Sequence, residues 1–428
     1  MAFGHVTGEL RKLYFLFAMR RYPPAAASVG AFLFSFSLTR GGYLNHPQLL
    51  AHYWTPMALA FLIQWLKAND LRSQVKFAVL ATVMLSCQFW SAFYLGWFLA
   101  FGLITLAGIL FYRFRGSLVH ETVERRTSIL AAGITFLIST GPLAIRHLMA
   151  AKGMGMRSTK EVLDGLPRLS DYLLPQTDTT FYQPLFQLTK GAHENYSEFG
   201  MFLGTIPILM MTMLVIAEMR RPRLSKQKWQ ENLPAYAAGL SAILFLCIFL
   251  MVTRWNNSDT LWRAFVNLLP AAMAIRIMGR IALFLLIPTG LVVAWYLERL
   301  SQRNSPWAKI AAVVIGLAVI AEQHAINRYA FSKRESMAEI QVLIDQIPQR
   351  CPVFYQATAS DANWRTVVNA MWAAIITEKA TLNGYSGGFP PGYHAAKLDQ
   401  PGSANLKTAN QWLTSFGSAP LAAGCFVL

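Results

Sequence analysis

The stretch FYLGWFLAFGLITLAGILFY occupies residues 93–112, and an arginine follows it directly. It carries no charged side chain, and it is long enough for an α-helix to cross a bilayer, which takes about 20 apolar residues. A single run of this kind also fits the buried helix of a large soluble domain. Because similar runs recur along the chain, we predict an integral membrane protein.

The composition of the whole chain agrees with this prediction. Of the 428 residues, 54% are hydrophobic and only 14% are charged, and the mean hydropathy is +0.36. The formal net charge of +17 suggests nucleic acid as a partner, but the cations mostly flank apolar runs instead of clustering on one polar domain. Flanking cations are typical of topology signals, so membrane lipids are the expected partner and nucleic acid is not.

Several apolar runs approach the length of a membrane span. Their approximate bounds are residues 24–39, 53–67, 77–89, 93–112, 128–147, 199–218, 233–253, 281–297 and 308–323. The predicted fold class is therefore mainly α: a polytopic transmembrane helix bundle of about nine spans.

Lysine and arginine orient these spans. If residues 1–23 are cytoplasmic, each alternate loop is short and basic, and the longer segments near 148–198, near 254–280 and from 324 to 428 lie outside. We therefore predict a multi-pass protein of the cytoplasmic (inner) membrane, with its N-terminus inside. The concentration of longer segments outside indicates that the outer face is the functional one.

Residues 324–428 form a second predicted domain, which follows a membrane domain of residues 1–323. The elements expected in it are helices over 333–347, 362–379 and 405–416 and strands over 352–356 and 424–428. This succession predicts a small extracytoplasmic α/β domain. Cys351 and Cys425 each fall at a strand edge, so they either form a disulfide in an oxidising compartment or remain two unrelated free thiols.

Arg276 and Arg280 lie four residues apart in LLPAAMAIRIMGRIALFLL, where an outside loop enters the eighth span. At helical spacing, both guanidinium groups would share one face near the membrane interface. Arginine suits bidentate phosphate contact, so the pair predicts a binding site for a lipid monophosphate or diphosphate. Snorkelling of both side chains to phospholipid headgroups is the alternative.

A catalytic base would come from the loop near 148–198, which holds the main outside supply of carboxylates. Asp171 in LSDYLLP and Glu198 in SEFGMFLG lie closest to apolar structure, and they are our candidate catalytic residues. Each also fits a solvated loop charge or an acid favoured at the start of a helix.

His46, in YLNHPQLLAHYWTP, is a candidate hydrogen-bonding residue for a sugar or phosphate, although the segment also fits an interfacial aromatic belt. His46 and His52 are poorly spaced for a metal on a helix. No cofactor and no metal site is therefore predicted, although a divalent metal is compatible with the proposed chemistry. Tyr94 belongs to a short outside turn with Gln88 and Trp90, which fits the same belt or stacking on a sugar.

Several stretches resemble one group of bacterial membrane proteins. MRRYPPAAASVGAFLFSFS, NHPQLLAHYWTPMALAFLIQWL, LSDYLLP, SEFGMFLG, LLPAAMAIRIMGRIALFLL and LNGYSGGFPPGY are similar to elements of proteins related to the C-type membrane glycosyltransferases, including the YfhO-like branch. The resemblance implies a multi-helix fold with an outward-facing active site. It also implies a polyprenyl-phosphate-linked sugar as donor and a lipid or cell-envelope glycan as acceptor.

Many members of this family carry a catalytic acid in the outside loop after the first span, whereas TRGGYLNHPQLLAHYW has no carboxylate. The basic N-terminal stretch resembles the tail of an earlier span, so the chain either begins after that loop or is not a competent transferase. Two other function classes stay open. One is a transporter or flippase for lipid-linked intermediates, and the other is a non-catalytic membrane assembly protein on the same fold.

Overall fold

The computed structural model describes most of the chain, in segments. They are residues 22–43, 46–154, 157–175, 179–189, 200–220, 233–255, 260–269, 271–325, 331–356, 364–384, 402–415, 417 and 425–427. The chain divides into two compact units, one of Met1–Ile145 with Arg157–Arg328 and the other of Arg146–Met156 with Tyr329–Leu428. The division near residue 328 lies close to the predicted domain boundary, but the short internal segment of the second unit was not expected.

The first unit consists of α-helices joined by short helical turns. Its elements are α2 (Pro24–Phe36), α3 (Leu38–Gly41), α4 (Pro47–Leu50), α5 (Trp54–Lys67), α6 (Leu71–Ser91), α7 (Phe93–Glu124), α8 (Arg126–Met154, whose end belongs to the second unit), α9 (Thr159–Asp164), η1 (Leu169–Leu173), α10 (Gln183–Thr189), α12 (Thr205–Arg220), α14 (Leu233–Val252), α15 (Trp262–Phe265), η3 (Ala272–Ala274), η4 (Met278–Ile281), α16 (Ala282–Ser301) and α17 (Pro306–Glu322).

Capping residues in the sequence explain where several of these helices begin. At the start of α6, a carboxylate oxygen of Asp70 accepts the backbone N–H of Ser73 at 2.8 Å. At the start of α9, the hydroxyl of Ser158 accepts the N–H of Glu161 at 3.2 Å. Each contact satisfies a backbone donor that the first helical turn leaves without a partner. Proline opens both α2 and α17, where its missing N–H has no cost.

Within the described chain, each expected span overlaps a helix, and the prediction of a mainly helical protein is confirmed. Four of the described helices are long and apolar enough to cross a membrane: Phe93–Arg113, Arg126–Gly153, Ala235–Val252 and Met278–Ser301. Others are shorter. Helix α2, with 13 residues, extends only about 20 Å at 1.5 Å per residue, against a hydrocarbon core of about 30 Å.

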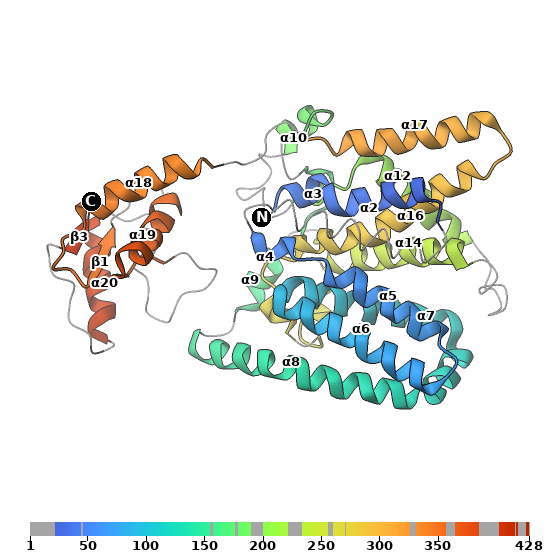
Figure 1. Ribbon diagram of the computed structural model, residues 1–428, viewed down its shortest axis with the longest axis horizontal. Helices are drawn as coiled ribbons and strands as arrows, with labels where there is room; N and C mark the ends of the chain where they lie inside the picture. The colour runs from blue at the N-terminus through green and yellow to red at the C-terminus, as the bar shows by residue number, and fades with distance from the viewer. Residues whose placement is uncertain are drawn as a thin grey trace. The chain divides into compact units, whose positions relative to one another are not determined.

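Helix α16 is the centre of the first unit. It packs against α2, α12, α14 and α17. In the membrane-length segment Met278–Ser301, 83% of the apolar stretch is buried inside the protein. Helix α8 is peripheral, because only 11% of the apolar stretch in Arg126–Gly153 is buried. The hydroxyl groups of Ser139 in α8 and Ser86 in α6 lie 2.7 Å apart and hold the two helices together. The long helices lie side by side with their axes roughly aligned (Figure 1).

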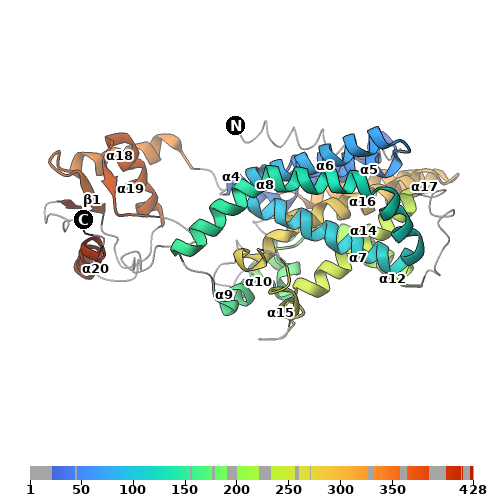
Figure 2. The ribbon, with the colours of Figure 1, turned by 90° about the horizontal axis from the view of Figure 1, so that it is seen from below.

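The connections between the long helices lie at two opposite ends of the first unit. The short helices α3, α4, α9 and α10 gather at the end where α16 begins, which we call the loop end (Figures 1 and 2). The α5–α6, α7–α8 and α16–α17 connections lie at the other end. Gln323 joins the loop-end segments, because its amide oxygen accepts the N–H of Leu38 at 3.1 Å and its amide nitrogen donates to the carbonyl of Leu203 at 3.2 Å.

The second unit contains helices and a small parallel sheet. Its elements are α18 (Lys333–Gln346), β1 (Val353–Gln356), α19 (Trp364–Thr377), β2 (Ala380–Thr381), α20 (Gly402–Ser415) and β3 (Phe426–Val427). The strand order is β2-β1-β3, with Phe354 opposite Thr381 on one side of β1 and Tyr355 opposite Phe426 on the other. Five of these elements overlap those expected from the sequence, whereas β2 was not expected.

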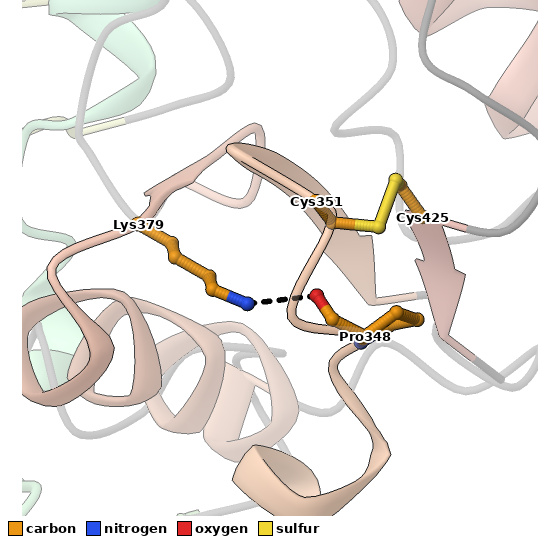
Figure 3. Close-up of a disulfide and its surroundings, with 4 residues drawn as sticks. All are labelled: Pro348, Cys351, Lys379 and Cys425. Atoms are coloured by element: carbon orange, nitrogen blue, oxygen red, sulfur yellow. Dashed lines mark hydrogen bonds between the residues drawn. A yellow bond between two sulfur atoms is a disulfide. The ribbon is translucent and has the colours of Figure 1, made fainter.

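The second unit has an apolar core and a covalent link. Ile340 and Leu343 of α18 pack with Phe354 of β1 and with Ala370 and Ala373 of α19. Cys351, just before β1, forms a disulfide with Cys425, just before β3 (Figure 3). Beside it, the ammonium group of Lys379 donates to the carbonyl of Pro348 at 2.7 Å. The disulfide therefore links the two segments that lead into the paired strands β1 and β3.

Candidate functional site

Arg280 is a nearly buried cation at the loop end. It lies in the 3₁₀ turn η4, immediately before α16, and only 7% of it is exposed. Its Nη2 lies 3.2 Å from Nε2 of His46, and its guanidinium carbon lies 5.1 Å from the ring centre of Tyr94. Three elements, η4, the start of α4 and the start of α7, therefore meet at this guanidinium group.

His46 contributes an acceptor to this contact. A guanidinium group has N–H donors and no acceptor. The contact is therefore a hydrogen bond in the tautomer that carries its proton on Nδ1 and accepts at Nε2. His46 sits at the start of α4 with its ring edge-on to Tyr43. The neutral ring orients Arg280 without cancelling its positive charge.

Tyr94 is the residue that connects Arg280 with Arg276. Its ring lies beneath the Arg280 guanidinium, a cation–π arrangement, and its hydroxyl oxygen accepts the backbone N–H of Arg276 at 3.0 Å. The sequence indicated only an interfacial or sugar-stacking aromatic at this position. The other two residues of the predicted turn make different contacts. Gln88 is buried against α5, and the indole N–H of Trp90 donates to the carbonyl of Ser139 in α8.

Arg276 and Arg280 do not lie on one α-helix, which corrects the helical-spacing argument. Ile275 and Ile277, on either side of Arg276, have ψ values of 96°, and α16 begins only at Ala282. The extended segment is held against Gly165, whose carbonyl accepts the N–H of Met278 at 2.9 Å. A Cβ at Gly165 would lie 1.6 Å from the carbonyl oxygen of Arg276, so only glycine permits this approach.

The side chain of Arg276 is half-buried, and the structure shows no ion pair for it among the residues it describes. The two arginines are thus close in sequence and share Tyr94, but they reach the loop end on different backbone conformations. Tyr94 contacts the guanidinium group of Arg280 but only the backbone of Arg276. The nearly buried guanidinium of Arg280 suits an anionic group with several oxygen acceptors.

Asp171 is fully buried and hydrogen-bonded within its own turn. One of its carboxylate oxygens accepts the backbone N–H of Arg168 at 2.7 Å, and the other accepts the hydroxyl of Ser170 at 3.3 Å. Its carbonyl also accepts the N–H of Met201 at 2.9 Å. These contacts close the turn η1, so the described geometry favours the helix-start role over that of a base open to substrate. Glu198, the other candidate, lies outside the described residues.

A second arginine–histidine contact lies in the same loop-end region. Arg40 is buried, donates from Nε to the carbonyl of Phe34 at 2.9 Å, and places its guanidinium carbon 4.7 Å from the centre of that ring. Its Nη2 lies 3.3 Å from Nδ1 of His52, which is also buried. Burial and the positive charge of Arg40 hold the pKa of His52 well below its ordinary value, so His52 is neutral near pH 7.

Glu322, which the sequence analysis did not single out, is a buried acid at the loop end. One of its oxygens accepts the hydroxyl of Tyr182 at 2.6 Å and the N–H groups of Thr205 and Ile206 at 3.1 and 3.3 Å. Those N–H groups open α12, so Glu322 caps that helix across the fold. Burial, reinforced by the bond to Glu322, raises the pKa of Tyr182. Glu322 thus holds the Tyr182 segment to two long helices.

Within the described ranges, no group of three or more histidine, cysteine, aspartate or glutamate side chains is arranged to hold a metal ion. Comparison with protein-family models, with curated proteins and with solved structures found no match for this chain.

Proposed function

We propose that this chain is a glycosyltransferase-like membrane protein that binds a polyprenyl-phosphate-linked sugar and transfers the sugar to a lipid or cell-envelope glycan. The observation that carries the proposal is the cluster of Arg280, His46 and Tyr94. A guanidinium group withdrawn from water attracts a phosphate more strongly than an exposed one, since the surrounding dielectric is lower. The cluster lies where a long apolar helix begins, a position that suits a ligand with a lipid tail.

The proposed setting is the cytoplasmic membrane, crossed about nine times, with the N-terminus inside and the loop end and second unit outside. Three observations support it. Four helices have membrane length, the basic connections lie opposite the loop end, and the second unit holds a disulfide. Disulfides persist mainly in oxidising compartments, which the outer side of such a membrane provides.

The proposed chemistry is an inverting transfer. The acceptor hydroxyl attacks the anomeric carbon and gives its proton to a carboxylate, while the bond from that carbon to the phosphate oxygen breaks. Polyprenyl phosphate leaves with the bonding electron pair, and Arg280, assisted by Arg276, balances the growing negative charge. Of the two candidate bases, we assign Glu198, because the carboxylate of Asp171 is buried and bonded within its own turn.

The burial of Asp171 and the absence of an acid from residues 39–54 favour one second candidate. This is a non-catalytic membrane assembly protein that binds the same lipid phosphate through the same arginines. The two candidates share the binding step and differ in whether a glycosidic bond forms.

A transfer assay separates them. The full chain is reconstituted in vesicles with a radiolabelled polyprenyl-phosphate sugar and a lipid-glycan acceptor, and labelled product is measured. We expect transfer by the parent protein, its loss in a variant with Arg276→Ala and Arg280→Ala, and its retention in Arg263→Ala, where an exposed arginine of the same loop is removed. Unchanged transfer in the double variant would exclude the two arginines from the mechanism. Arginine-dependent binding without product would establish the second candidate.

A further inference from the structure

Helix α19 of the second unit has two apolar faces. One face packs inward, where Val367, Ala370 and Ala373 are buried in the unit. The opposite face is exposed although its large side chains are apolar. Its members are separated by three, four or seven residues, or adjoin along the same broad stripe of the helix. We call them the α19 outer face: Trp364, Met371, Trp372, Ile375 and Ile376.

The neighbouring helix α18 shows what a water-facing surface of this unit looks like. Its buried residues are Ile340 and Leu343, and its exposed positions are mostly charged or amide side chains, among them Glu335, Gln341 and Asp345. On the α19 outer face, by contrast, Ile375 is 67% exposed and Trp372 is 51% exposed. A contiguous apolar patch of this kind marks an interaction surface, since soluble domains rarely expose one without a use for it.

The apolar patch extends onto the segment that enters the second unit. Phe331 is exposed and lies edge-on to Trp364, with ring centres 5.8 Å apart. The next residue, Ser332, caps α18, and the short segment 323–332 leads there from α17 of the first unit. Even fully extended, a segment of this length spans roughly 35 Å. The patch therefore belongs to a unit that follows the membrane-length helices directly in the chain.

The two cations of the α19 region, Arg365 and Lys379, already have partners, whereas Lys333 and Arg334 at the start of α18 are exposed. Arg365 pairs with Glu339 at 2.7 Å, and the ammonium group of Lys379 donates to the carbonyl of Pro348 at 2.7 Å. What the face offers to a partner is thus apolar area with two tryptophans, the side chains that favour the boundary between headgroups and acyl chains.

We propose that the α19 outer face docks on the lipid surface of the membrane in which the first unit is embedded. Trp364 and Trp372 lie at headgroup level, and Ile375 and Ile376 reach the upper acyl region. Docking holds the second unit at the bilayer, within reach of a ligand whose tail is in the lipid. Because apolar area is its main driving force, docking does not require anionic lipid. This inference does not depend on the phosphate site.

The test uses the full chain and places a reporter on α19 or, in a separate variant, on α18. Cys87→Ser and Cys247→Ser leave the Cys351–Cys425 disulfide in place. Ile375→Cys, or separately Gln341→Cys on the exposed face of α18, then receives a nitroxide label. Each protein is reconstituted in phosphatidylcholine vesicles, and collisions of the label with oxygen, which enters lipid, and with a water-soluble nickel chelate are measured.

We expect the label at 375 to collide with oxygen and to be shielded from the chelate, and the label at 341 to show the reverse. A label at 375 that is as open to the chelate as the one at 341 would overturn the proposal, because the face would be in water. Shielding from both reagents would also overturn it, because a second copy or the first unit would then cover the face. Thiol titration checks that the disulfide has formed, and Ile376→Cys replaces any variant in which it has not.

Discussion

Nη2 of Arg280 lies 3.2 Å from Nε2 of His46, although the two residues are 234 positions apart in the chain. Each was a candidate phosphate ligand on separate sequence grounds, and the fold brings them into contact at the loop end. Because arginine can only donate, the contact requires a neutral imidazole. In the proposed function, the phosphate of the donor would meet a guanidinium group that is already oriented and keeps its full positive charge.

Arg280 should dominate binding of a lipid phosphate. Arg280→Ala is expected to weaken retention of polyprenyl phosphate by about tenfold or more, since loss of a charge-assisted hydrogen bond costs about 1.5–3 kcal/mol. Arg276→Ala should weaken it less, because that side chain is more exposed, and Arg263→Ala should leave it unchanged. Equilibrium binding to vesicles containing labelled polyprenyl phosphate measures all three. Equal affinities for the parent protein and Arg280→Ala would contradict the assignment.

Tyr94 should act through two separable contacts. Tyr94→Phe keeps the ring beneath Arg280 but removes the acceptor for the N–H of Arg276, a loss of about 1 kcal/mol. Tyr94→Leu removes the ring face as well. Affinity for polyprenyl phosphate should therefore fall in the order parent, Phe, Leu, with Arg280 still present in each. Tyr112→Phe, at an exposed tyrosine near the other end of the long apolar run of α7, is the matched control. Identical affinities for Phe and Leu would show that the ring face contributes nothing.

The sequence was sufficient to locate the long helices, because apolar length and flanking charge are local signals, but it did not indicate the short helices of the loop end. It could not predict the conformation around Arg276. Nothing near that residue excludes a helix, and the extended backbone depends on a contact with Gly165, more than a hundred positions earlier. Tertiary contacts of this kind override local propensity.

The buried acid Glu322 was missed for a related reason. In the sequence it is one acid in the last turn of an apolar helix, with no local partner to indicate burial. Its hydrogen-bond partners Tyr182 and Thr205 lie 140 and 117 positions away. For Asp171, the sequence indicated the position next to apolar structure but not the role of the side chain. Its carboxylate accepts a backbone N–H of its own turn, η1.

Asp171 should therefore behave as a structural cap. Asp171→Asn keeps an oxygen that can accept the N–H of Arg168, so it should retain most of its thermal stability and most of its transfer activity. Asp171→Ala removes the acceptor and should lower the free energy of unfolding by about 1–2 kcal/mol. Unfolding temperature and product formation are measured on the same preparations. Loss of transfer in Asp171→Asn at an unchanged unfolding temperature would instead identify Asp171 as a base.

His52 should make the fold sensitive to acid. Its pKa in the folded protein is held below the ordinary value of 6.5, first by burial and then by Arg40, so the unfolded chain binds a proton more readily than the folded one. The stabilising contribution of a neutral His52 is therefore complete above pH 6.5 and is lost as the pH falls towards the folded pKa, at up to about 1.4 kcal/mol per pH unit. Thermal unfolding in detergent should show a falling midpoint between pH 7 and pH 5. His52→Gln should flatten that profile, whereas His120→Gln, at an exposed histidine of α7, should keep it. A parent profile retained in His52→Gln would assign the acid sensitivity to other groups.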